Sequence, residues 1–250
     1  MDRMVYTALS GLRGQMAAQA TIANNIANAS TTGFRADRVA FQQMMLQGGP
    51  GLPSRAPTGE EVLDADRTAG AIRATGRALD VAVTGDQWIA VQATDGTEAY
   101  TRRGDLRVAA SGVLETGDGF PVIGTSGGPI TVPPAQKVMF AEDGSLSIVP
   151  MGAAPGTEPQ VIDRLKLVST TGSQTVKGVD NLLHVKGGGV LPEDLEGRIA
   201  TASLEGSNVN MTQALVDMIE NQRSYEVQAN LLKEAKQLDE SSASLMRLPS

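Results

Sequence analysis

The chain has 250 residues, a net charge of −7 and no cysteine. Its length allows one large domain or two smaller ones. The acidic balance argues against nucleic acid or an anionic membrane surface as the main partner, because both attract clustered cations. Without cysteine, disulfides and thiolate metal sites are excluded. The sequence has no apolar run long enough to span a membrane, so we expect no direct membrane insertion.

The first twenty residues share some features with a secretory signal peptide. Met4 to Leu12 is mildly apolar, and Ala18 to Ala20 is similar to a cleavage site. However, Thr7, Ser10 and Gly11 interrupt the apolar run. We therefore expect that this segment is not cleaved.

The N-terminal segment is predicted to form a helix that carries very little charge. Its apolar and small residues recur at alternating intervals of four and three, as in a coiled-coil seam. These residues are Val5, Leu9, Leu12, Met16, Gln19, Ala23 and Ile26. Thr32-Gly33 is a suitable stop, since glycine adopts a left-handed backbone easily. A solvated helix normally has a charged outer face, so this helix is expected to be contacted on several sides.

A second, shorter apolar segment follows from Arg35 to Leu46. The next segment is rich in glycine and proline, beginning at Gly48 to Pro53, and no regular helix can begin there. We expect residues 47–78 to form a linker or extended loop.

The central part, residues 79–205, has the pattern of short β-strands. Apolar residues alternate from Leu79 to Val83, and further short apolar runs follow. Asp-Gly or Ser-Gly pairs separate several of these runs, and such pairs favour tight hairpin turns. The pairs are Asp95-Gly96, Ser111-Gly112, Asp118-Gly119 and Asp143-Gly144. The spacing predicts an all-β domain, either a small antiparallel barrel or a folded sheet.

The C-terminal segment, residues 206–250, is predicted to contain a long amphipathic helix from Met211 to Arg247. Asn210 can cap it, and Gln213 stands where a capping box requires it. One apolar stripe is followed by a second with a shifted phase, which indicates a change of partner along the helix. The stripes are Met211, Leu215, Met218, Gln222, Tyr225, Ala229 and Leu232, then Val227, Leu231, Ala235, Leu238, Ser242 and Leu245. Residues 1–46 are assigned to the N-terminal helix and the segment that follows it. The fold class is therefore α+β, and we expect the terminal helices to pair as a coiled coil.

Residues that support catalysis are scarce. His184 is the sole histidine, and its setting between apolar residues is typical of a strand. No serine lies in a nucleophile elbow, and no glycine loop continues into a phosphate-binding motif. The acidic pairs Glu60-Glu61, Glu193-Asp194 and Asp239-Glu240 are interpreted as solvated, with a glycosidase dyad as the alternative. We expect no enzyme, no cofactor and no metal site.

Motifs at both ends carry a resemblance. Residues 23–28, Ala-Asn-Asn-Ile-Ala-Asn, followed by Thr31-Thr32-Gly33-Phe34, resemble the N-terminal signature of the bacterial flagellar axial proteins. Residues 205–210, with 218–226, resemble their C-terminal signature. Three central segments, Leu79 to Asp86, Ala99 to Arg102 and Pro121 to Gly124, resemble the β-domain of rod and hook proteins. One departure is Gln87-Trp88, where family members often have an aromatic pair.

The resemblance implies a flagellar basal-body rod subunit with no enzymatic activity. It implies export by the flagellar type III apparatus without a cleaved signal peptide. It also implies helical assembly with itself and with other rod proteins, in a rod that crosses the periplasm, encloses the export channel and carries torque. The opening residues and the chain length are most similar to proximal rod subunits. A distal rod subunit is the alternative within the family, and a soluble module whose helices dock on a partner or membrane is the alternative outside it.

Eleven residues of the two signatures are predicted to form the assembly interface. They are Asn24, Asn25, Ile26, Asn28, Gly33, Phe34, Asn208, Asn210, Gln222, Arg223 and Tyr225. For Asn24 and Asn25 we favour hydrogen bonds between subunits, because both fall within the helical stripe. For Asn210 we favour a capping role.

Overall fold

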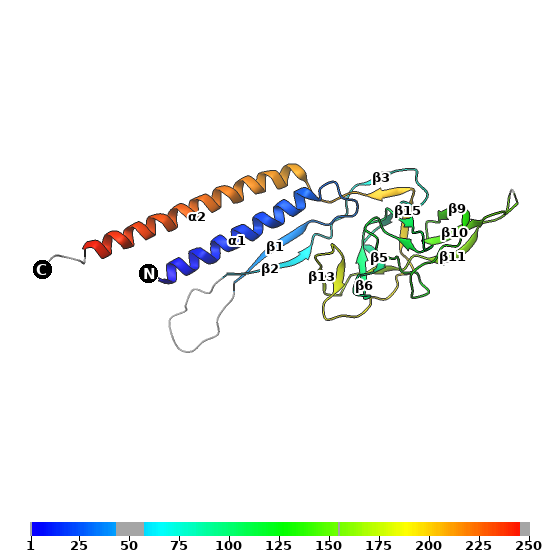
Figure 1. Ribbon diagram of the computed structural model, residues 1–250, viewed down its shortest axis with the longest axis horizontal. Helices are drawn as coiled ribbons and strands as arrows, with labels where there is room; N and C mark the ends of the chain where they lie inside the picture. Colours follow the sequence, from blue (N-terminus) through cyan, green and yellow to red (C-terminus); the bar gives the residue numbers. More distant parts are fainter. Residues whose placement is uncertain (1, 44–57, 155, 246–250) are drawn as a thin grey trace. The chain divides into compact units, whose positions relative to one another are not determined.

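The computed structural model describes residues 2–43, 58–154 and 156–245 (Figure 1). These residues divide into two compact units. The first unit contains helices α1 (Asp2–Ala27) and α2 (Met211–Leu245), strand β1 (Asp37–Gln43) and most of β2 (Thr58–Ala65). The second unit combines residues 28–36 with residues 64–209. The predicted Gly48 to Pro53 loop and the last residues of the predicted C-terminal helix, 246–247, lie outside the described residues.

In the first unit, α1 and α2 lie along one another in antiparallel orientation (Figure 1). Gln15 contacts Ser224, and Gly11 lies next to Gln228, so residue numbers fall along one helix as they rise along the other. Strands β1 and β2 form a two-stranded sheet, and β1 contacts α1. The N-terminal helix ends at Ala27 with three turn residues after it, before the predicted stop at Thr32-Gly33.

The second unit consists of short strands, as the alternating pattern predicted. The largest sheet has the order β12-β5-β6-β14-β13, a second has the order β11-β10-β9, and three further sheets have two strands, β15-β4, β16-β3 and β7-β8. The bounds are β3 (Ile72–Ala74), β4 (Val81–Thr84), β5 (Gln87–Gln92), β6 (Glu98–Thr101), β7 (Arg107–Val108), β8 (Leu114–Glu115), β9 (Ala135–Phe140), β10 (Ser145–Pro150), β11 (Gln160–Arg164), β12 (Leu167–Ser169), β13 (Thr175–Lys177), β14 (Leu183–Val185), β15 (Arg198–Thr201) and β16 (Ser203–Glu205).

The structure confirms the prediction of short antiparallel β-strands, but it does not confirm that they close into a barrel. The pairings of β3 to β16 are antiparallel. Among the described strands, no sheet closes on itself, so the barrel alternative is not confirmed. All four glycines of the predicted turns have a positive φ, between 84° and 89°, which is the conformation that those turns require.

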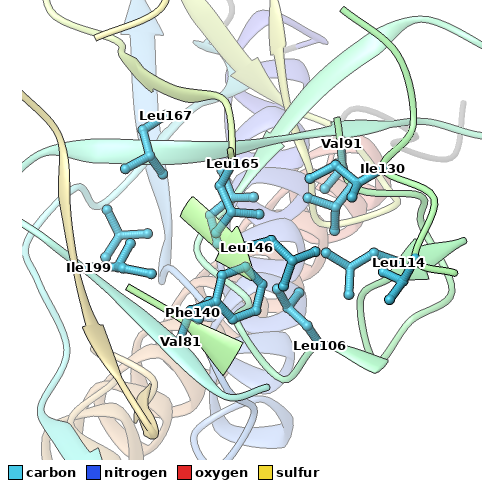
Figure 2. Close-up of a cluster of buried hydrophobic side chains, with 14 of the residues drawn as sticks. Val81, Val91, Leu106, Leu114, Ile130, Phe140, Leu146, Leu165, Leu167 and Ile199 are labelled. Atoms are coloured by element: carbon cyan, nitrogen blue, oxygen red, sulfur yellow. The ribbon is translucent and has the colours of Figure 1, made fainter. Parts of the chain in front are cut away.

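One apolar core lies between these small sheets. Val81, Ile89, Leu106, Leu114 and Leu165 are fully buried in it and come from well-separated parts of the chain. Figure 2 shows Phe140 and Leu146 directed toward the same cluster, with Leu167 and Ile199 at its side. A second cluster contains Trp88, Ala90, Tyr100 and Val168. Strand β5 therefore supplies residues to both clusters, because its side chains alternate between two covered faces.

Candidate assembly interface

The two helices meet through small and polar side chains, which we call the helix seam. It consists of Gly11, Gly14, Gln15 and Ala18 on α1, with Asn221, Ser224 and Gln228 on α2. Gln15 Nε2 donates a hydrogen bond of 2.9 Å to Ser224 Oγ. The buried amide oxygens of Gln15, Asn221 and Gln228 have no hydrogen-bond partner. These unpaired polar atoms reduce the stability of the helix pair, because a buried polar group without a partner is costly.

The apolar residues predicted for the seam lie mostly elsewhere. On α1, the side chains of Leu9 and Met16 are 41% and 58% exposed. On α2, the exposed apolar side chains are Met211, Leu215, Val216, Ile219, Val227, Leu231 and Leu238. The half-buried positions Met218, Tyr225 and Leu232 agree with the predicted first stripe. Both helices therefore keep an uncovered apolar face in the single chain.

Asn24 and Asn25 have partners within the first unit. The Asn25 side chain forms two hydrogen bonds with the backbone of Asp37: Oδ1 accepts from the N–H at 2.8 Å, and Nδ2 donates to the carbonyl at 3.0 Å. Asn24 Nδ2 donates to the Asp37 carboxylate at 2.8 Å. Asn25 therefore joins the last turn of α1 to the first residue of β1, and Ile26 is half-buried beside it.

Residues 28–34 belong to the second unit and turn sharply. Asn28 Oδ1 accepts a hydrogen bond from the Thr31 hydroxyl at 3.1 Å. Gly33 has φ +67°, and its N–H donates to the carbonyl of Glu205 at 2.8 Å. The Phe34 side chain is buried, with Lys177 Nζ 3.8 Å from the centre of its ring. Gly33 and Phe34 are thus internal parts of this unit.

Asn208 connects three segments of the second unit through hydrogen bonds. Its Oδ1 accepts from the N–H of Ala36 at 2.7 Å, and its Nδ2 donates to the carbonyls of Asp66 at 2.9 Å and Thr68 at 3.0 Å. Its own N–H donates to the carbonyl of Phe34 at 3.3 Å. One amide side chain therefore satisfies backbone groups just before β1 and just after β2.

The remaining predicted residues lie on or near α2. Asn210 Oδ1 accepts from the N–H of Gln213 at 3.2 Å, which is N-cap geometry. The side chain of Gln213 bonds to Asp217 and not back to Asn210, so one half of the predicted capping box is formed. Gln222 and Arg223 are exposed, while Tyr225 is half-buried.

A buried charge cluster, the junction cluster, was missed by the sequence reasoning. It consists of Arg35, Arg102, Glu205 and Trp88, all within the second unit. Glu205 Oε1 accepts from Arg35 Nη2 at 2.6 Å and from the N–H of Gly70 at 2.8 Å, and Oε2 accepts from Arg102 Nη1 at 3.1 Å. Both guanidinium carbons lie near the Trp88 ring, at 5.7 and 5.5 Å from its centroid.

Two cations and one anion share this closed space. Burial lowers the pKa of Arg102, and the positive charge of Arg35 lowers it further, while Glu205 opposes both effects. The Trp88 ring offers its negative face to guanidinium nitrogens that have no hydrogen-bond partner. The cluster thereby holds the segment after α1 and the segment before α2 in one unit. The signal that could have revealed it is the position of Arg35 directly after the N-terminal signature and of Glu205 as the first residue of the C-terminal one.

The fold and these contacts define an axial subunit, with paired terminal helices and a β-unit between them. Three family models match the chain: "Flagella basal body rod protein" over residues 5–35, "Flagellar hook protein FlgE/F/G D1 domain" over 82–148, and "Flagellar basal body rod FlgEFG protein C-terminal" over 200–245. The flagellar basal-body rod proteins FlgF of Salmonella typhimurium and Escherichia coli are both 40% identical over 238 residues, covering 93% of each chain. FlgG of Bacillus subtilis is 30% identical over 280 residues, covering 99% of this chain and all of that one.

The chain therefore belongs to the flagellar basal-body rod protein family, which is a family of structural proteins and not of enzymes. Neither of the helices that the structure describes combines the length and apolarity needed to cross a membrane.

Proposed function

We propose that this rod-family chain is a structural subunit of the proximal rod, which assembles helically through its terminal helices with itself and with other rod subunits. The observation that carries the proposal is the uncovered apolar surface of both helices. Leu231 and Leu238 are 59% and 72% exposed, and Met16 is 58% exposed. Burial of such side chains contributes about 1.5–3 kcal/mol each, so neighbouring helices would stabilise the pair strongly. In the assembled rod the helices would pack as coiled coils around the export channel and transmit torque.

The position within the rod rests on the relatives. Two FlgF proteins match at 40% identity, whereas a third FlgF protein and several FlgG proteins match at about 30%. A proximal position is therefore favoured over a distal one.

Export by the flagellar type III apparatus, without removal of an N-terminal signal, is part of this proposal. Cleavage after Ala20 would remove Gly14, Gln15 and Ala18, which form most of the α1 side of the helix seam. The helix pair would then lose its contact surface. An uncleaved chain is thus the form that is compatible with the terminal helices.

Deletion of the gene tests the proposal. We expect purified basal bodies to lack a complete rod, with the truncation at the proximal stage and with recovery on expression of the intact chain. A truncation at the distal stage would favour the distal alternative. Complete rods carrying hooks would contradict a role as a rod subunit.

A soluble helix-docking module is the second candidate, because exposed apolar side chains also suit a partner outside a polymer. Membrane-surface helices favour Lys and Arg on the polar face, whereas α2 has Asp217, Glu220, Glu226 and Glu234 among its exposed or half-exposed residues. Co-sedimentation of the isolated protein with anionic vesicles checks this candidate, and a protein that stays in the supernatant counts against it.

A further inference from the structure

The exposed face of α1 has a heptad pattern of its own. Six of its exposed side chains follow one another at intervals of four and three, and they are Leu9, Arg13, Met16, Ala20, Ala23 and Ala27; Asn24 is exposed beside them. Arg13 is the single charged residue between Leu9 and Ala27. This α1 outer stripe is therefore an apolar helix face, with small residues toward its end and one cation within it.

The second half of α2 has a matching stripe on its exposed side. Val227, Leu231, Glu234 and Leu238 follow one another at intervals of four, three and four. Val227 and Leu231 are each 59% exposed, Leu238 is 72% exposed, and Glu234 is also exposed. This α2 outer stripe contains one anion among three apolar residues. At about 100° per residue, it borders the helix seam on α2, with Leu231 about 20° and Glu234 about 80° around the helix from the seam residue Ser224.

We propose that the α1 outer stripe of one subunit binds the α2 outer stripe of an adjacent copy of the same chain. The inference rests on the proposed function, because it requires polymerisation. An antiparallel alignment that sets Arg13 against Glu234 also sets Leu9 against Leu238, Met16 against Leu231 and Ala20 against Val227. All four residues of the α2 outer stripe then have a partner: the three apolar residues lie opposite apolar residues, and the anion lies opposite the cation. Small Ala20 opposite β-branched Val227 allows the helices to approach closely.

The ion pair defines this register. A single charged position in an apolar helix seam specifies alignment, because any other alignment buries an unpaired charge. Moving the partner helix by one heptad would place Arg13 opposite Val227 or Ser241. Either alternative loses the pairing of Arg13 with Glu234. A second copy is a suitable occupant because it supplies the cation that the acidic α2 requires.

The same chain cannot make this contact with itself. The bond between Gln15 and Ser224 fixes the intrachain register, in which Glu234 lies level with residue 5 and not with Arg13. The difference is eight residues, or about 12 Å along the helix axis. The two stripes also differ from one another, so the contact is heterologous. A heterologous contact does not close on two copies and continues from one subunit to the next.

Engineered cysteines test the contact, since the chain has none of its own. The double variant Met16→Cys/Leu231→Cys should, on oxidation in purified basal bodies, shift to two and more times the mass of one chain. Leu9→Cys/Leu231→Cys displaces one cysteine by a heptad, about 10 Å, and should remain at the mass of one chain. Ala18→Cys/Asn221→Cys lies across the helix seam and should link only within the chain.

Charge reversal gives a second, independent measurement. Arg13→Glu and Glu234→Arg should each reduce motility and the amount of the chain in basal bodies, and the double reversal should restore both. The proposed contact is overturned if the Met16→Cys/Leu231→Cys variant is present in rods and stays at the mass of one chain, or if the double reversal is no better than either single one. Absence of the unaltered chain from basal bodies would instead overturn the proposed function.

Discussion

Glu205 and Arg35 form a 2.6 Å ion pair in which both side chains are buried. Glu205 ends β16, close before α2, and Arg35 follows the turn after α1. The carboxylate has a second cation, Arg102, at 3.1 Å. One acidic side chain therefore pairs with two buried guanidinium groups, and its loss removes the carboxylate that both of them contact.

The first prediction concerns Glu205→Gln. The variant keeps the side-chain size but removes the carboxylate that pairs with both buried cations, and breaking a buried pair in this way typically costs about 3–5 kcal/mol. We expect the free energy of unfolding of the second unit to fall by that amount in urea titrations. Glu193→Gln is the matched control, because Glu193 forms a partly exposed pair with Arg164 at 4.0 Å. Such pairs contribute about 0–1 kcal/mol, so equal losses in the two variants would contradict the role of the cluster.

The second prediction concerns Gly33→Ala. A Cβ at Gly33 would lie 2.5 Å from the backbone of Arg102, and φ is already +67°. Gly76 has a similar φ of +77° but open space around its Cβ position. Gly76→Ala should therefore cost about 1–2 kcal/mol, the backbone penalty alone. Gly33→Ala should cost clearly more, measured as the shift in urea midpoint. Similar urea midpoints for the two variants would mean that the close contact of Gly33 with the Arg102 backbone does not exclude a side chain at position 33.

Strand positions in the second unit were largely predictable, because burial on one face produces a visible alternation. The pattern at Leu79 to Val83 corresponds to β4, and the Asp-Gly turns have the expected backbone. Strands β2 and β3 lie within residues 47–78, where glycines and prolines favour a linker. The three residues of β3 are exposed and show no alternation that would predict a strand. The junction cluster was not predictable: its ion pairs join residues 170 and 103 positions apart, and an isolated arginine or glutamate is normally a surface residue.

The sequence could not predict which faces of the two helices pack together, and the reason differs from that for the junction cluster. A heptad pattern identifies which residues share one side of a helix, but not which neighbour covers that side. Leu9 and Met16 have the regular spacing, yet Gly11 and Gln15 are the residues that contact α2 in the single chain. Small residues are weak signals in a sequence, although they allow close approach of two helices. Two competing faces on one helix are what a subunit with several neighbours requires.

The third prediction concerns Asn25→Leu. The substitution removes both hydrogen bonds to the Asp37 backbone. We expect the second unit to keep its unfolding midpoint, because Asn25 and Asp37 belong to the first unit, while basal bodies lack complete rods. Asn24→Ala removes only the exposed bond to the Asp37 carboxylate and should have a weaker effect on rod completion. Normal rods and motility in Asn25→Leu cells would count against an assembly role for this residue.

The fourth prediction is a loss of stability at alkaline pH that depends on Tyr100. This side chain is buried: its hydroxyl donates to Glu98 at 2.9 Å and accepts from the N–H of Leu191 at 2.6 Å. Burial raises the pKa of Tyr100 well above its ordinary value. The folded state thus holds the proton more tightly than the unfolded chain, in which the pKa is about 10. The protonated Tyr100 side chain contributes fully to stability below about pH 10. Its contribution to the free energy of unfolding falls as the pH rises above that value.

Urea titrations on both sides of that pH measure this contribution. The Tyr100→Phe variant should be less stable at neutral pH by about 1–3 kcal/mol, because the N–H of Leu191 loses its acceptor. Its further loss above pH about 10 should be smaller than that of the unaltered chain, since the titrating group is gone. Tyr225→Phe, on α2 in the other unit, should keep the alkaline loss of the second unit unchanged. If Tyr100→Phe shows the same alkaline slope as the unaltered chain, the titration of Tyr100 is not the cause of the alkaline loss.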